Sequence, residues 1–190
     1  MNRSERSARI IATYRDAMSL VDAFAREVYE VACEPCIESD TSHGKEARGC
    51  CTMVDMAYEH ITGPAADDIR ELSAQASAGR MATTKISCIY HDAESGCMLG
   101  DLKPPVCASF YCDDARKRLS RDLGIYVERP LLMQPLDAIL RDELREGSHP
   151  VRGADGVIME GVNPETLASF RRYIIALTER ARTVQSSRRR

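Results

Sequence analysis

The sequence lacks any apolar run long enough to cross a membrane. A transmembrane helix needs about 20 consecutive apolar residues, whereas the longest candidate here runs only from Tyr173 to Leu177. The first residues, Met1 to Arg9, are polar and charged, and the apolar stretch of a signal peptide does not follow them. We therefore expect a cytoplasmic protein that makes no membrane contact.

A large excess of charge of one sign is also absent. Charged residues make up 29% of the chain, but the formal net charge is only -3. Proteins that bind nucleic acids generally carry a basic face, so we expect no nucleic-acid partner. The motifs G-x-G-x-x-G, the P-loop and G-x-S-x-G are missing as well. Nucleotide binding or hydrolysis by those routes is therefore unsupported.

Cysteine is the residue type that this chain has in abundance. Its eight cysteines form two groups of four, spaced C-x2-C-x13-C-C and, after 36 further residues, C-x8-C-x9-C-x4-C. Structural disulfides are rare in the reducing cytosol, so metal ligation is the leading interpretation. The candidate ligands are Cys33, Cys36, Cys50, Cys51, Cys88, Cys97, Cys107 and Cys112.

The spacing of these thiols bears on which metal they would bind. Thiolates are soft ligands that favour zinc, Cu(I) or iron–sulfur clusters over calcium and magnesium. Zinc ribbons commonly use two C-x2-C pairs, whereas this chain has one. The vicinal Cys50 and Cys51 suit an irregular cluster loop, although the spacings differ from those of ferredoxins. The pattern favours an iron–sulfur cluster, with 4Fe-4S as the first choice and zinc as the alternative.

Some of these residues have other interpretations. Cys88 and Cys112 have apolar neighbours and could be buried as small hydrophobic side chains. His43 and His91 lie between cysteines and could replace a thiol, because imidazole also binds these metals. Tyr111 could pack over a cluster and limit its contact with water.

Hydrophobic periodicity predicts a mainly helical fold with a cysteine-rich centre. Apolar residues spaced 4-3-4-3-4-3 from Ile10 to Val31 predict a helix over 4–31, with Ser4 as its N-cap. We expect this stripe to face the core of the same chain. Further helices are expected over 64–78, from Pro104–Pro105 to a stop at Gly124, over 135–146 and over 164–184, with a hairpin over 85–101 and loops over 33–51 and 147–163.

Cys107 and Cys112 are treated separately, because on one regular helix they would point about 140° apart. Either the helix starts after Cys112, or the two cysteines serve different sites. We prefer the first and place a tight turn between them, with a helix from near Asp113, whose carboxylate suits a first turn. The expected organisation is a single domain over 1–190. It consists of the helix 4–31, a metal-binding core over 33–112 and a helical part over 113–190.

Part of the sequence resembles a known family. The run Cys33-x2-Cys36 followed by Cys50-Cys51, Gly96-Cys97, Lys103-Pro104-Pro105-Val106-Cys107 and Phe110-Tyr111-Cys112 is similar to the CxxCxxCC family of zinc- or iron-chelating proteins. The resemblance covers roughly residues 33–112. It departs from the family in the long gap before the vicinal pair and in Lys103, where the family has arginine. The family includes a flagellin lysine methylase that resembles an enzyme using an iron–sulfur cluster and S-adenosylmethionine, so the resemblance implies iron over zinc.

Three functions are compatible with these residues. The favoured one is an iron–sulfur protein, acting in electron transfer or as a cluster-dependent enzyme that could bind S-adenosylmethionine at an open iron position. The alternatives are a structural zinc module for protein–protein contact and a thiol-based protein for metal handling or redox sensing. A redox or enzyme partner protein is expected in the first case, and the sequence specifies neither catalytic residues nor an oligomeric state.

Overall fold

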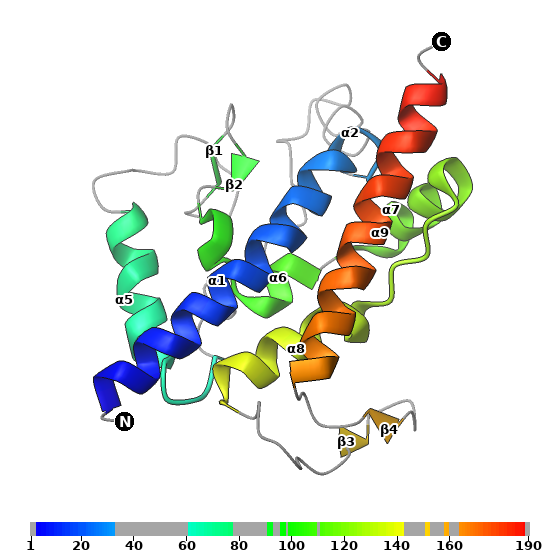
Figure 1. Ribbon diagram of the computed structural model, residues 1–190. Coiled ribbons are helices and arrows are strands. Elements are labelled where there is room, and N and C mark those ends of the chain that lie inside the picture. Colours follow the sequence, from blue (N-terminus) through cyan, green and yellow to red (C-terminus); the bar gives the residue numbers. More distant parts are fainter. Residues whose placement is uncertain are drawn as a thin grey trace.

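Two long helices form the centre of the molecule, which is a computed structural model (Figure 1). Helices α1 (Arg3–Glu27) and α9 (Pro164–Arg188) lie side by side, and α8 (Arg129–Leu140) packs against both. The structure describes residues 3–32, 61–77, 91–92, 96–97, 99–109, 111–142, 151–152, 158–159 and 164–188. This part of the chain is mainly helical, as predicted.

The apolar stripe predicted for the first helix faces the core of the same chain. After α1 ends, a one-residue break at Val28 separates it from the short helix α2 (Tyr29–Ala32). The amide of Ala32 still donates to the carbonyl of Val28 at 2.8 Å, so the chain keeps its helical direction. The prediction that Ser4 is the N-cap is wrong, because the helix already begins at Arg3. The buried members of the stripe are Ile10, Tyr14, Ala17, Val21, Phe24 and Val28.

Helix α5 (Ala66–Ser77) lies close to its predicted position, with Asp67 and Asp68 in the first turn. It is preceded by Gly63, whose backbone φ of +122° is rarely adopted by residues that have a side chain. A Cβ atom at Gly63 would lie 2.2 Å from the carbonyl oxygen of Leu140, the last residue of α8. The chain can therefore pass the end of α8 at this point only because residue 63 lacks a side chain.

The helix predicted from Pro104–Pro105 to Gly124 is divided into three pieces. The 3-10 helix η1 (Gly100–Leu102) precedes α6 (Pro105–Ser109), and α7 (Asp113–Arg118) continues directly into a π-helical segment, η2 (Leu119–Leu123). The start at Asp113 and the stop at Gly124, which has a φ of +61°, are confirmed. The tight turn predicted from Cys107 is wrong in its first half, because Pro104 and Pro105 initiate α6 and Cys107 lies within it.

Helix α8 begins and ends about six residues before its predicted bounds of 135–146. Pro130 lies in the first turn of α8, where the missing N–H costs nothing. The residues Leu132, Leu136 and Ile139 are buried on one face, and this burial keeps the helix intact through Pro135. Arg141 caps the helix, and Asp142 follows with a φ of 57°.

Two short antiparallel pairs of strands complete the described part. Strand β1 (His91–Asp92) pairs with β2 (Gly96–Cys97), and β3 (Val151–Arg152) pairs with β4 (Ile158–Met159). The segment 147–163, which was predicted to be a loop, therefore contains the antiparallel strand pair β3 and β4. The hairpin predicted over 85–101 lies largely outside the described residues and stays a prediction. None of the described helices is both long and apolar enough to cross a bilayer.

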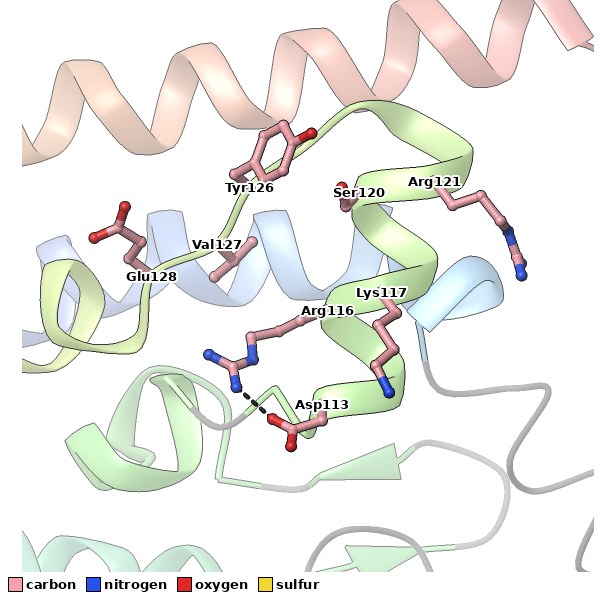
Figure 2. Close-up of a pocket in the computed structure, with 8 residues that line it drawn as sticks. All are labelled: Asp113, Arg116, Lys117, Ser120, Arg121, Tyr126, Val127 and Glu128. Carbon is pink, nitrogen blue, oxygen red and sulfur yellow. Dashed lines mark hydrogen bonds and ion pairs between the residues drawn. The ribbon is translucent and has the colours of Figure 1, made fainter.

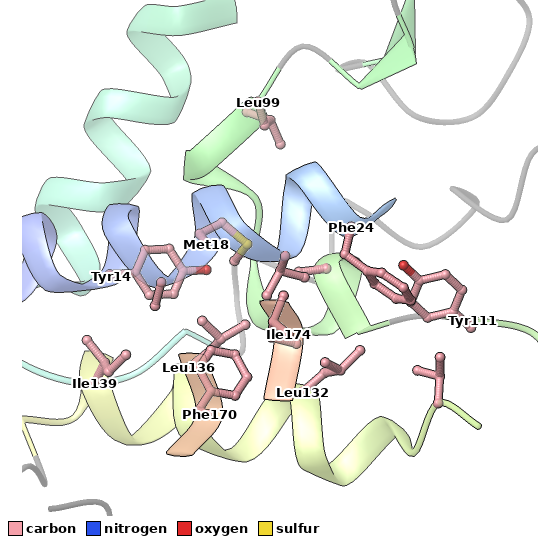
Figure 3. Packing of buried hydrophobic residues seen from close by; sticks show 14 of the residues in the cluster. Tyr14, Met18, Phe24, Leu99, Tyr111, Leu132, Leu136, Ile139, Phe170 and Ile174 are labelled. Atoms are coloured by element: carbon pink, nitrogen blue, oxygen red, sulfur yellow. The ribbon is translucent and has the colours of Figure 1, made fainter. Parts of the chain in front are cut away.

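The core lies where α1, α8 and α9 meet (Figure 3). Met18 of α1, Leu136 of α8 and Ile174 of α9 are fully buried in it. Phe170 and Ala181 of the same helix are also buried, and α9 confirms the helix predicted over 164–184. Leu99, Ala108 and Leu119 belong to this core, so the segment that carries Cys107 and Cys112 packs against it.

Candidate metal centre

The described residues include part of the predicted ligand set. The side chains of Cys107 and Cys112 are described, and Cys97 is described through its backbone in β2. Within the described part of the chain, no group of three or more potential ligands is assembled. The predictions for the other cysteines lie outside the described residues, and these are Cys33, Cys36, Cys50, Cys51 and Cys88.

Cys107 and Cys112 lie on either side of the junction between α6 and α7. Both are half-buried thiols that pack against the hydrophobic core, and neither is in a disulfide. The amide of Cys107 donates to the carbonyl of Pro104 at 2.9 Å, which closes the first turn of α6. Each thiol is therefore attached to a backbone that is fixed by helix formation and by packing. The sequence also allowed Cys112 to be buried as a small hydrophobic side chain, and its half-burial agrees with that interpretation.

Cys112 is also the N-cap of α7. Its backbone is extended, with φ -62° and ψ 164°, and its sulfur accepts a hydrogen bond from the amide of Ala115 at 3.4 Å. N-cap positions are usually filled by serine, threonine, aspartate or asparagine, whose oxygens accept this bond. A sulfur in the same place is held in a defined direction by a backbone N–H group. Hydrogen bonds of this kind tune the potential of a cluster that is bound through such a sulfur.

The chain before Cys107 is fixed to α1 through Lys103. The Lys103 ammonium forms an ion pair with Asp22, and the Tyr14 hydroxyl donates to the carbonyl oxygen of Lys103. Burial alone would raise the pKa of Asp22, but Lys103 and Arg26 outweigh it and hold this pKa below its usual range. Asp22 is therefore a carboxylate at neutral pH, and its ion pair with Lys103 joins the cysteine-bearing segment to α1.

Ala32, the residue directly before Cys33, contacts the end of α7 that is farther from Cys112. The Arg118 guanidinium, at the end of α7, donates to the carbonyl oxygen of Ala32 at 2.7 Å. Ala32 is the last residue of α2, which packs against α7. A second contact is made nearby, since the rings of Phe24 and Tyr111 lie 6.0 Å apart at an angle of 55°. Tyr111 thus packs in the core beside Cys112.

An open hollow lies next to this junction, and Figure 2 shows its lining. It has a volume of about 590 Å³ and lies between α7 and the chain that follows η2. The Arg116 guanidinium bonds to Asp113, the neighbour of Cys112, and this bond holds the pKa of the exposed Asp113 carboxyl below its usual range. Tyr126 is 75% exposed at the edge. The residues that line the hollow are Asp113, Arg116, Lys117, Ser120, Arg121, Tyr126, Val127 and Glu128.

Sequence reasoning did not identify Asp22 and Arg118 as residues that shape this region. Asp22 offered a weak signal, since it is a carboxylate next to the apolar stripe and one helical turn before Arg26. Arg118 offered none, because its partner is a backbone carbonyl 86 residues away.

Comparisons with known proteins add no family or relative to this geometry. The chain matches no family model, and neither a curated protein nor a solved structure is significantly similar to it.

Proposed function

We propose that this chain is a metal-binding protein whose cysteine thiolates hold an iron–sulfur cluster. The observation that supports it is the placement of Cys107 and Cys112: two half-buried thiols at one helix junction, neither in a disulfide and each on a backbone fixed by helix formation. This donor set fits a soft metal centre, because thiolates bind iron–sulfur clusters and zinc in preference to hard cations. The remaining six cysteines would supply the other ligands.

The hydrogen bond from Ala115 to the sulfur of Cys112 supports a cluster in particular. Cluster potentials depend on hydrogen bonds to sulfur and on exposure to water. Tyr111 and Phe24 give the neighbourhood of Cys112 an apolar side. In this setting the protein's own residues would fix the ligand sulfur, donate one hydrogen bond to it and limit water on the core side. The bound cluster would supply electron transfer, and an iron with an open position would add a binding site for a substrate or for S-adenosylmethionine.

The test is to purify the chain under strictly anaerobic conditions and to measure iron, zinc and acid-labile sulfide per chain. The proposal predicts iron and sulfide in stoichiometric amounts, with a brown colour that bleaches on reduction. The matched control is the Cys107→Ser, Cys112→Ser double variant, which should lose metal while keeping its helical circular dichroism. Stoichiometric zinc without sulfide would replace the cluster by a structural zinc module. A folded chain without metal would contradict both.

A further inference from the structure

The hollow beside α7 is built from one helix face and from the chain that follows η2. Five of its eight lining residues come from α7 and η2, at positions 113, 116, 117, 120 and 121. Such a spacing of three and four residues places side chains on one face of a helix. The other three, Tyr126 to Glu128, lie between η2 and α8. The volume of about 590 Å³ is within the range of small-molecule sites, about 300–1,000 Å³.

The chain after η2 is held in place by α9. The Tyr173 hydroxyl donates to the carbonyl oxygen of Tyr126 at 3.4 Å, and the Arg180 guanidinium donates to the carbonyl oxygen of Gly124 at 3.1 Å. Both donors belong to α9, which packs against η2. This side of the hollow therefore has its shape without a ligand, and a preformed site avoids part of the entropy cost of binding.

Two cations on the helix face retain hydrogen-bond donors for a ligand. Arg116 bonds to Asp113 through one nitrogen, and the Lys117 ammonium lies 3.6 Å from Asp114, which is too far for a hydrogen bond. A guanidinium has five N–H donors and an ammonium has three. Both ion pairs are exposed, and exposed pairs contribute little to stability. An anionic ligand can therefore bind to both cations without losing much of the existing structure.

The π-helical segment η2 contributes two further residues to the lining. Arg121 makes two bonds to Asp122, at 2.8 and 2.7 Å, and its side chain points away from Tyr126 in Figure 2. Arg121 therefore adds positive charge to the region, but its donors are directed at Asp122. Ser120 adds a hydroxyl to the lining. Segments of π-helix occur frequently at functional sites.

Tyr126 gives the hollow an aromatic face. It is the most exposed of the large hydrophobic side chains that the structure describes. Figure 2 shows its ring and the Arg116 guanidinium on opposite sides of Val127, which is buried. Glu128 adds an exposed carboxylate next to Val127. The hollow thus combines an aromatic ring, two cations and a hydrogen-bond acceptor.

We propose that this hollow binds a nucleotide. Arg116 and Lys117 hold its phosphate, because guanidinium and ammonium groups are the usual phosphate donors in proteins. Tyr126 stacks on its base, and such stacking tolerates any base because each has a π-face. Glu128 accepts hydrogen bonds from the ribose hydroxyls. The site does not need the glycine-rich motifs that the sequence lacks, and it is independent of the metal, since its lining includes none of the candidate ligands.

The first test compares AMP, adenosine and ribose 5-phosphate by isothermal titration calorimetry with the full chain. We expect AMP to bind saturably, at one molecule per chain and about ten-fold more tightly than either of the other two. Only AMP offers both a base to Tyr126 and a phosphate to Arg116 and Lys117. If AMP does not bind saturably, or binds no more tightly than adenosine or ribose 5-phosphate, the inference is wrong.

Arg116→Ala tests the phosphate contact. The substitution should weaken AMP binding about ten-fold or more, because a charge-assisted hydrogen bond is lost, and should leave adenosine binding unchanged. Arg15→Ala is the matched control, since Arg15 lies on α1, is 49% exposed against 45% for Arg116, and also pairs with one carboxylate, that of Asp101. Equal AMP affinities in the two variants would overturn the inference.

Tyr126 is tested by substitutions that keep or remove its ring. Tyr126→Leu should weaken AMP binding several-fold and leave ribose 5-phosphate binding unchanged, whereas Tyr126→Phe should keep the affinity of the wild type. Because the Tyr126 side chain is exposed, both variants should fold, and circular dichroism establishes this. If the leucine variant binds AMP as tightly as the wild type, the base does not stack on Tyr126 and the proposed site is wrong.

Discussion

Lys103 and Asp22 form an ion pair that joins the segment before Cys107 to α1. The pair is largely shielded from water, because the two side chains are only 14% and 12% exposed. Arg26 adds a second cation to the same carboxylate at 2.7 Å. Tyr14, which is fully buried, bonds to the backbone of Lys103. The position of the cysteine-bearing segment therefore depends on a few polar groups at the edge of an apolar helix face.

Replacing Asp22 with asparagine should destabilise the protein by about 1–3 kcal/mol. The Lys103 ammonium would lose its carboxylate partner while staying largely out of water, and such a loss costs more than a surface ion pair is worth. The measurement is urea denaturation at neutral pH. The control is Asp16→Asn, because the pair of Asp16 with Arg171 is 58% and 42% exposed and should contribute no more than about 1 kcal/mol. Equal effects of the two substitutions would contradict this account.

The same carboxylate should give the protein a dependence on acid. The pKa of Asp22 is lower in the folded chain than its ordinary value of 3.8, so the unfolded chain binds the proton more tightly. Asp22 therefore contributes stability above pH 4, and this contribution is lost as the pH falls through the folded pKa. The stability difference between wild type and Asp22→Asn should be constant near neutral pH and should shrink below pH 4. A difference that stays constant down to pH 2 would exclude this role.

Much of the helical framework could be predicted from the sequence, because its signals are local. The stripe from Ile10 to Val28, the start of α7 at Asp113 and the stop at Gly124 each depend on residues within a few positions of one another. The bounds predicted for α8 are about six residues too late, because Pro135 lies inside the helix, where proline normally interrupts it. The true start lies near Pro130, and burial of Leu132 and Leu136 outweighs the cost of the second proline.

The contacts around the candidate centre could not be predicted in this way. Lys103 and Asp22 are 81 residues apart, and Arg118 and Ala32 are 86 residues apart. Nothing in the pattern of either partner identifies the other, because a charged residue on a helix is usually solvated. The cysteine spacing predicted that thiols from two stretches converge. The structure adds two fixed points, at Ala32 directly before Cys33 and at Lys103 four residues before Cys107.

Gly63 should be the least tolerant of the glycines that the structure describes with a positive φ. In Gly63→Ala the new methyl group would meet the backbone of Leu140 and Arg141, which cannot rotate away as a side chain can. Adding this overlap to the strain of a positive φ gives an expected destabilisation of about 2–5 kcal/mol. The measurement is the free energy of unfolding in urea.

Gly100→Ala is the matched control for that substitution. Gly100 also has a positive φ, of +53°, but a Cβ atom there would meet nothing within 4 Å. Only the backbone strain remains, which costs about 1 kcal/mol. If both alanine variants lost the same stability, the close approach of Gly63 to the end of α8 would contribute nothing to the cost of the Gly63 substitution.

Cys112 allows its structural role to be separated from its role as a ligand. A serine at this position can accept the hydrogen bond from Ala115, and serine is a preferred N-cap, whereas alanine cannot accept it. In metal-free protein, Cys112→Ser should be as stable as the wild type, and Cys112→Ala should be less stable by about 0.5–2 kcal/mol. The measurement is thermal or urea denaturation after metal removal.

The metal content of the same two variants should not depend on whether the new side chain can cap the helix. A hydroxyl is a poor ligand for soft metals, so serine and alanine at position 112 should lower the bound iron or zinc to the same extent. Elemental analysis of anaerobically purified protein gives this number directly. If the serine variant kept the metal of the wild type, the sulfur of Cys112 would not be a metal ligand. Cys112 would then serve only as the N-cap of α7, a role that serine can also fill.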